Sequence, residues 1–222
     1  MDLVLSLVGG RWVFTVAEVG WDRLASRPMG RFVYWMNVSL DLRIEHRSGE
    51  DGGGDWLRIG ESLHREFNAR ARAMSLMVQG RRVYEIMDPF WPDARTDESL
   101  PDYMREYGEI WTAKPKLLVS NTRTSAEHNT RVIGGEDVIT QLATVRATTQ
   151  GDIGVGGATL ATQLLRANLL DELLLFTHPV VLGSGRPLFD DDAGPLHLDL
   201  LETGAFEGGV TMHRYAVRHA SE

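Results

Sequence analysis

The sequence of 222 residues contains no cysteine, no long apolar segment and no excess of basic side chains. Without cysteine the chain can form neither disulfides nor thiolate metal sites, and we predict no metal centre. No apolar run reaches the roughly 18–20 residues that cross a bilayer. The net charge of −8 argues against nucleic-acid binding, because phosphate backbones require concentrated Lys and Arg. These absences favour a cytoplasmic protein that acts on small molecules.

The first 29 residues form an N-terminal extension of uncertain status. Residues 3–8 are apolar, but Asp2 precedes them and no basic region is present, so we do not expect a signal peptide. An extra strand, a tail, or a true start at Met29 each explain this stretch. The mass of the native protein distinguishes them. We expect residues 30–218 to form one domain.

Strand-like and helix-like segments alternate from residue 31 to residue 217. The expected strands are 32–36, 75–78, 116–119, 152–155, 172–181, 196–200 and 210–217. Ile59, Leu63 and Phe67 form one helical stripe, and Asn168 suits a left-handed helix cap. The alternation predicts a single α/β domain with a mixed, mainly parallel sheet flanked by helices. A turn at residues 208–209 should add an antiparallel C-terminal edge hairpin.

The strongest local signal is the strand–turn–helix junction at residues 154–159. Glycines at a strand end let a pyrophosphate approach the backbone, and the N–H groups of the following helix point at it. Gly156, Gly157, Ala158 and Thr159 are therefore candidate cofactor ligands. A tight turn that needs positive φ explains the same glycines, and Thr159 can simply cap the helix. Both interpretations stay open.

A second junction carries Gly80, Arg81 and Arg82 at a helix start. Cations are unfavourable at this end of a helix, so an anion such as a ribose 2′-phosphate would compensate them. Two solvated arginines are the alternative.

A third strand end carries Ser120, Asn121 and Thr122, which can hold a ligand or form an ordinary turn. Because the carboxyl ends of parallel strands meet at one edge, the three junctions should open on the same cleft.

Several segments together resemble the dihydrofolate-reductase-like family that includes the C-terminal reductase domain of bifunctional riboflavin-biosynthesis enzymes. They are 38–41 (VSLD), 80–85 (GRRVYE), 91–92, 116–122, 154–160, 164–172 and 178–189 (HPVVLGSGRPLF). The resemblance runs in unbroken order from about residue 31 to residue 217. It implies NADPH-dependent hydride transfer to a small pterin-like or pyrimidine-like heterocycle. In such families residues 80–82 would meet the cofactor phosphates, 120–122 the adenosine side and 156–159 the pyrophosphate.

Two alternatives remain beside this general reductase. One is the narrower reduction of 5-amino-6-(5-phosphoribosylamino)uracil in riboflavin biosynthesis. The other is a non-catalytic nucleotide-binding protein, since a fold does not certify catalysis. The resemblance is also compatible with a homodimer.

The substrate side is where the chain departs from its relatives. The family usually has glycine after the aspartate, whereas Leu42 and Arg43 follow Asp41. Folate reductases carry a carboxylate where this chain has Leu63 and His64, so dihydrofolate is a poor substrate candidate.

We assign Asp41 to orienting or protonating the substrate, although it can equally cap a turn. The candidate substrate-binding residues are Asn37, Ser39, Trp56, Tyr84 and Arg186. Trp56 and Tyr84 can instead belong to the core, and Arg186 to a glycine turn. His64 is expected at the surface or its boundary.

Overall fold

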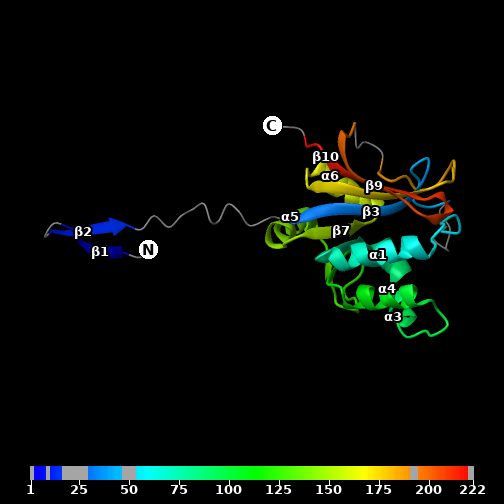
Figure 1. Cartoon of the computed structure of the whole chain (residues 1–222), viewed down its shortest axis with the longest axis horizontal. Helices are drawn as coiled ribbons and strands as arrows, with labels where there is room; N and C mark the ends of the chain where they lie inside the picture. Colours follow the sequence, from blue (N-terminus) through cyan, green and yellow to red (C-terminus); the bar gives the residue numbers. More distant parts are fainter. Residues whose placement is uncertain (1–2, 9–10, 17–29, 47–53, 191–194, 220–222) are drawn as a thin grey trace.

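The computed structural model describes residues 3–8, 11–16, 30–46, 54–190 and 195–219. Its main feature is an eight-stranded sheet with the order β6-β5-β4-β7-β3-β8-β10-β9 (Figure 1). The strands are β3 (Arg31–Ser39), β4 (Leu76–Gly80), β5 (Lys116–Val119), β6 (Thr130–Ile133), β7 (Asp152–Gly156), β8 (Leu170–His178), β9 (Leu198–Ala205) and β10 (Thr211–Val217). The six strands from β6 to β8 are parallel, and β10 and β9 add the expected antiparallel edge.

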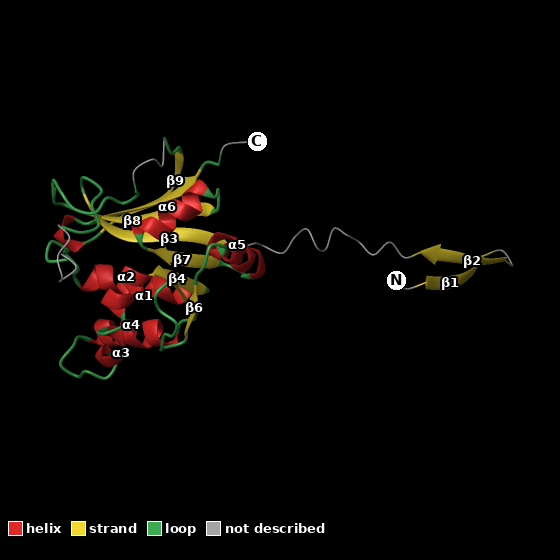
Figure 2. Ribbon diagram, turned by 180° about the vertical axis from the view of Figure 1, so that it is seen from behind, coloured by secondary structure: helices red, strands yellow, loops and turns green. Residues whose placement is uncertain are grey.

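Helices cover both faces of this sheet (Figure 2). They are α1 (Glu61–Ala73), α2 (Arg81–Met87), α3 (Trp91–Ala94), α4 (Asp102–Ala113), α5 (Val138–Thr148) and α6 (Ala158–Arg166). One core cluster joins α5 and α6 to the sheet through Leu142 and Leu164, and the other joins α1 and α4 through Leu63 and Trp111. Each fully buried large apolar side chain contributes about 1.5–3 kcal/mol, so these two layers fix the sheet between them.

Some elements differ from the expectation. The helix after the first loop begins at Glu61, and Ile59 is exposed outside it. The strand expected over residues 172–181 spans Leu170–His178, because Pro179 has no N–H for the ladder. β6, α3 and α4 were not predicted from the sequence. Gly108 of α4 explains how α3 and α4 pack closely, since a Cβ there would lie 2.7 Å from the carbonyl oxygen of Trp91.

The C-terminal edge also differs in detail. β9 begins at Leu198, and its pairing with β10 shifts between Arg214 and Tyr215. Such a bulge reorients the residues beyond it. Leu196 precedes the strand, and Leu200, next to the bulge, is exposed instead of sharing one buried face with Leu198.

Within the extension, β1 (Leu3–Val8) and β2 (Arg11–Val16) pair antiparallel as a separate two-stranded sheet. Met29, the alternative start, lies outside the described residues. In the part of the chain that the structure describes, no helix is long and apolar enough to span a membrane.

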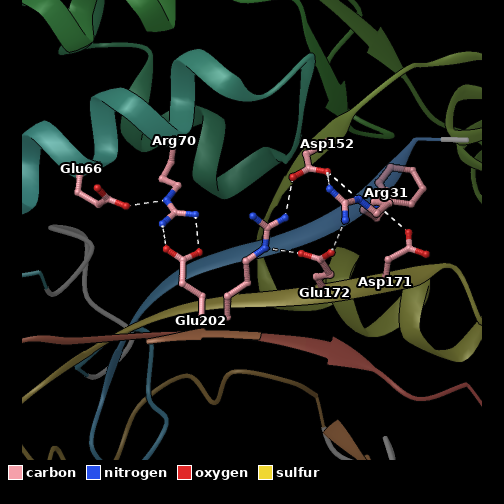
Figure 3. Close-up of polar contacts among 9 residues, drawn as sticks. Arg31, Glu66, Arg70, Asp152, Asp171, Glu172 and Glu202 are labelled. Carbon is pink, nitrogen blue, oxygen red and sulfur yellow. Dashed lines mark hydrogen bonds and ion pairs between the residues drawn. The ribbon is translucent and has the colours of Figure 1, made fainter. Parts of the chain in front are cut away.

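The amino end of the parallel strands carries a closed ring of charges (Figure 3). Arg31 of β3 contacts Asp152 of β7 at 2.5 Å and Glu172 of β8 at 2.9 Å. Arg214 of β10 contacts the same two acids, Asp152 at 2.7 Å. Glu172 is almost fully buried, and each charge in the ring meets two opposite charges. Beside the ring, Arg70 of α1 bridges two further acids. The ring ties four strands together at this end.

Candidate functional site

Three turns lie side by side at the opposite edge of the sheet. β5, β4 and β7 are neighbours and parallel, so the turns that follow them, at residues 120–122, 80–82 and 156–159, share one edge. The juxtaposition expected from the sequence is therefore present. A carboxyl edge of this kind is where α/β sheets bind ligands.

The glycine turn after β7 combines both interpretations of the sequence. Gly157 has φ +111°, which favours glycine, so the turn has a structural reason. A Cβ on Gly157 would lie 3.8 Å from the backbone of Gly80, so the two strand ends also approach closely. No side chain caps the start of α6. The N–H groups of its first turn are therefore available to an anion.

Arg186 lies at the start of α6. Its Nη2 donates a hydrogen bond to Thr159 Oγ1 at 2.7 Å, and its guanidinium also pairs with Asp190. The structure thus brings a residue expected on the substrate side to the turn expected to hold the pyrophosphate. A cation there adds to the positive potential of the helix start.

Both arginines of the second turn have partners within the chain. Arg81 contacts Glu85 at 2.8 Å, and Arg82 contacts Glu45 at 2.9 Å. Both side chains are about half exposed. These carboxylates compensate the unfavourable position of the cations, so the pair does not by itself require a ligand. A phosphate would have to compete with them.

The third turn is held by its own side chains. Ser120 Oγ accepts hydrogen bonds from the N–H groups of Thr122 (3.2 Å) and Arg123 (3.0 Å). Asn121 Oδ1 accepts one from the N–H of Gly135 at 2.8 Å. The ordinary turn, which was one interpretation of this sequence, accounts for these contacts.

Asp41 is engaged on both carboxylate oxygens. Its Oδ1 accepts hydrogen bonds from Ser39 Oγ (2.6 Å) and the N–H of Leu182 (3.0 Å), and its Oδ2 accepts one from the N–H of Gly183 (2.9 Å). The Ser39 bond, with help from Leu182, lowers the pKa of Asp41 to about 2. Asp41 is therefore ionised at neutral pH and has no proton to donate. Its contacts are those of a residue that holds a loop.

These contacts belong to a clamp between the segment after β3 (residues 40–44) and the segment after β8 (residues 180–188). Backbone hydrogen bonds join Leu40 to Val180 (2.8 Å), Ile44 to Arg186 (2.8 Å) and Leu188 to Leu42 (3.0 Å). Leu42 has φ +56°, a conformation that favours glycine. The glycine that the family resemblance leads us to expect here would fit this backbone conformation, which the chain adopts with leucine.

The ends of β3 and β8 also carry a polar cluster. His178, which the sequence analysis did not assign to the site, is fully buried and lies between two residues. Its Nδ1 accepts a hydrogen bond from the N–H of Arg58 (3.0 Å), and its Nε2 lies 3.1 Å from Asn37 Oδ1. Trp56 meets the ring edge-on at 5.4 Å. Two expected substrate residues, Asn37 and Trp56, are thus brought together through His178. Its position before Pro179, at a strand end, was the available signal.

Three expectations for single side chains need correction. Tyr84 is fully buried against Trp111, so it leaves no accessible surface for a substrate. Ser39 is also fully buried, and its hydroxyl is used by Asp41 and by the N–H of Arg43. His64, expected at the surface or its boundary, is buried among the aromatic rings of α1, α3 and α4. Packing of distant elements decides each case.

A cavity of about 440 Å³ lies beside the clamp. Asp41, Leu42 and Arg43 line one side of it. The rest is largely apolar, from Leu165, Leu173, Leu175, Pro187, Leu188, Phe189, Leu196 and Leu198. Among the described residues no group of three or more His, Asp or Glu side chains could hold a metal ion.

Solved structures define the class of the fold. A riboflavin biosynthesis protein, described as putative, from Shewanella sp. PV-4 aligns with a TM-score of 0.63 and 21% identity over 85% of this chain and 99% of that chain. The deaminase/5-amino-6-(5-phosphoribosylamino)uracil reductase of Thermotoga maritima aligns with a TM-score of 0.57 and 14% identity over 86% of this chain and 57% of that one. Dihydrofolate reductase from Enterococcus faecalis, solved with NADP(H), aligns with a TM-score of 0.56 and 13% identity. The alignment covers 86% of this chain and 99% of that chain. The fold is that of dihydrofolate reductase.

Sequence comparison narrows the class to a family. The profile of the RibD C-terminal domain matches residues 32–212, and the chain belongs to that family. Two proteins of Bacillus subtilis (strain 168), both described as uncharacterized, are similar along most of their length. YyaP is 27% identical to this chain, over 83% of this chain and 94% of YyaP. YwjB is 28% identical, over 82% of this chain and 95% of YwjB.

Proposed function

We propose that this protein is an NADPH-dependent reductase that transfers hydride to a small pterin-like or pyrimidine-like heterocycle. The arrangement of the three turns after β5, β4 and β7 carries this proposal, within the family of the RibD C-terminal domain. The Enterococcus relative in fold was solved with NADP(H), which supports the choice of cofactor.

The residues at this edge fit a dinucleotide. Gly156 and Gly157 have no side chains, so a ligand can approach the backbone closely. No side chain caps the start of α6, and Arg186 lies next to this helix start. In the proposal these groups and Thr159 hold the pyrophosphate, with Ala158 at the helix start. Gly80, Arg81 and Arg82 meet the 2′-phosphate, and Ser120, Asn121 and Thr122 line the adenosine side. Bound NADPH would supply the hydride, and the chain would hold cofactor and substrate in position for its transfer.

The substrate lies in the proposal near Asn37 and Trp56, at the ends of β3 and β8. Burial and the nearby Arg58 lower the pKa of His178 to about 4, so this histidine is neutral at pH 7. Asp41, with a pKa of about 2, is ionised. Neither residue can donate a proton at neutral pH, so the proton that completes the reduction comes from water.

The narrower candidate is the reduction of 5-amino-6-(5-phosphoribosylamino)uracil, the reaction in the name of the Thermotoga relative. Arg186 supports it, because a guanidinium near the clamp can take a substrate phosphate. A non-catalytic nucleotide-binding protein remains the alternative if turnover is absent.

Titration of the purified chain with NADPH and NADH, followed by a substrate screen, tests the proposal. We expect NADPH to bind in the micromolar range and a heterocycle to be reduced. Failure to bind either cofactor at millimolar concentration contradicts the reductase. Binding without turnover of pterins, aminopyrimidines or flavins indicates the non-catalytic alternative, and turnover of the phosphoribosyl compound selects the narrower one.

A double variant, Arg81→Ala with Arg82→Ala, tests the phosphate role. We expect the preference for NADPH over NADH to fall by about tenfold or more, because two charge-assisted contacts are lost. Arg95→Ala, an exposed arginine elsewhere, is the control and should leave the preference unchanged. An unchanged preference in the double variant argues against the role.

We also propose that the protein acts as a homodimer through an apolar patch at the clamp. Leu40 and Val181 are each 65% exposed, and the hydrogen bond from the N–H of Leu40 to the carbonyl of Val180 joins their segments. Exposed neighbouring apolar residues favour an interface. Light scattering should give twice the chain mass, and Leu40→Asp should halve it, whereas Ile86→Asp, at another exposed apolar position, should not. A monomeric wild type contradicts the dimer.

A further inference from the structure

His178 is a buried titratable residue that the proposed chemistry does not use. It is the last residue of β8 and has no exposed surface. Three residues surround its ring: the backbone of Arg58, the side chain of Asn37 and the edge of Trp56. Burial makes the charged ring unfavourable, so the imidazole is neutral at pH 7.

The hydrogen bonds fix the tautomer of this neutral ring. The N–H of Arg58 donates to Nδ1 at 3.0 Å, so Nδ1 must present its lone pair. The single ring proton is then on Nε2. The partner of Nε2, at 3.1 Å, is the side-chain oxygen of Asn37, which can only accept.

This bond in turn fixes the amide of Asn37. Its oxygen is occupied by His178, so its NH2 group points the other way. Asn37 is partly exposed near the carboxyl end of β3, and no described residue accepts a hydrogen bond from its amide nitrogen. A rigid pair of N–H donors with no partner is thus presented at the edge where the substrate is expected.

We propose that His178 is a positioning residue that holds Asn37 as a hydrogen-bond donor, and that Asn37 reads a carbonyl oxygen on the heterocyclic substrate. This inference rests on the proposed function and deepens it. A ring with an oxo group at this place pairs with the donor. A ring with an amino group there meets donor against donor and is rejected.

Two matched pairs of probes test this selectivity: uracil with cytosine, and pterin with diaminopteridine. Each is titrated calorimetrically with and without NADPH, so that cofactor binding is recorded separately. We expect the wild type to prefer the oxo member of at least one pair by about tenfold or more, because the amino member leaves a buried donor unpaired. Equal affinity within both pairs, or no binding of any probe at millimolar concentration, overturns the proposal.

Asn37→Asp is the decisive variant. An aspartate still accepts the hydrogen bond from His178, so the fold is kept, but its other oxygen accepts instead of donating. The preference should shift toward the amino member by at least about tenfold. A preference identical to that of the wild type overturns the role of Asn37.

Variants of His178 separate positioning from stability. In His178→Leu the amide of Asn37 is free to turn over, so the ratio of oxo to amino affinity should fall toward one. In His178→Gln the ratio should persist, because glutamine can accept from Arg58 and donate to Asn37. His64→Leu is the control, since it removes another buried histidine and lowers stability without contacting Asn37.

The outcomes also distinguish this inference from the reductase itself. If the wild type binds NADPH and reduces a substrate while His178→Leu keeps the wild-type ratio, the positioning role is wrong and the reductase stands. If NADPH does not bind but the oxo preference responds to Asn37→Asp and His178→Leu as described, the site reads carbonyl groups in a protein that is not this reductase.

Discussion

The two ends of the parallel strands differ in how completely their polar groups are paired. At the amino end, Arg31 and Arg214 share Asp152 and Glu172, so each charge has two partners. At the carboxyl end, three buried polar atoms have no hydrogen bond among the described residues: Trp56 Nε1, Gln79 Oε1 and Arg43 Nε. The other unpaired buried atoms, Asp88 Oδ1, Trp111 Nε1 and Thr112 Oγ1, lie after α2 and in α4 and not in the charged ring.

This difference agrees with the proposed function, in which the amino end is structural and the carboxyl end binds the ligand. Most buried polar groups in folded proteins are paired, so a cluster of exceptions calls for an explanation. Local departures of this kind are expected at functional sites, where a bound molecule completes the pairing. In the proposed function the amino end stabilises the sheet, and the carboxyl end binds cofactor and substrate. Variants at either end can test this separation.

The largest effect is expected at the amino end. Glu172→Ala leaves the two arginines with only Asp152, and breaking a buried ion pair costs about 3–5 kcal/mol. For a chain of this size the melting temperature should fall by roughly 10 °C. Calorimetry measures it, with the exposed Glu109→Ala as control. The comparison also requires that NADPH affinity of the folded variant stay unchanged. A loss below about 1 kcal/mol would show that the ring is not a stabilising unit.

The second effect is a pH dependence at the carboxyl end. The pKa of His178 is about 4 in the folded protein and about 6.5 in an unfolded chain. As pH falls below about 6.5 the unfolded chain takes up this proton first, so the free energy of unfolding decreases until about pH 4. The contribution is up to about 3 kcal/mol. Urea denaturation of the wild type and His178→Gln at pH 7 and pH 4.5 measures it. Parallel losses in both proteins would assign the acid sensitivity to other groups.

The third prediction is a smaller change in stability, and it is a gain instead of a loss. Gln79 of β4 is 6% exposed, and its side-chain oxygen has no partner among the described residues. Gln79→Met keeps the shape and removes the unpaired group, so the apoprotein should gain about 1–2 kcal/mol. Thermal unfolding checks this, with Gln163→Met on the exposed side of α6 as the neutral control. A destabilised Gln79→Met would mean that the amide is satisfied in the free protein.

The smallest effect concerns backbone strain. Leu42 holds φ +56° and is 48% exposed, so Leu42→Gly relieves a left-handed conformation and loses little packing. We expect a net gain of about 0.5–1 kcal/mol. Chemical denaturation measures it, and Leu40→Gly, outside the left-handed region, should destabilise. A loss in Leu42→Gly would show that its packing outweighs the strain.

The sequence predicted those features that depend on neighbours along the chain. Local patterns predicted three of these features. They are the shared edge at which the parallel strands β5, β4 and β7 end, the left-handed cap at Asn168 (φ +58°), and the glycine turn between β9 and β10. β6 was missed because only two of its four residues, Val132 and Ile133, are apolar, whereas the equally short β5 has three in a row. α4 was missed although a helical signal was available, because Met104, Tyr107 and Trp111 recur at the three- and four-residue spacing of an apolar helix face.

The candidate site was predictable only in part, for the same reason. Strand ends mark where a ligand can bind, but the partner of each side chain depends on three-dimensional packing. Asn37 meets His178 across 141 residues of sequence, and Arg82 meets Glu45 from another loop. Neither contact has a local signature. The buried positions of Ser39 and Tyr84 likewise depend on contacts from distant elements.

The clamp has a consequence for how this family can diversify. Asp41 bonds Leu182 across 141 residues, so the segments after β3 and β8 behave as a single module encoded in two places. An insertion in one segment shifts the other, and natural changes in length should therefore occur in matched pairs. Grafting a relative's substrate loop onto this scaffold would need both segments transplanted together.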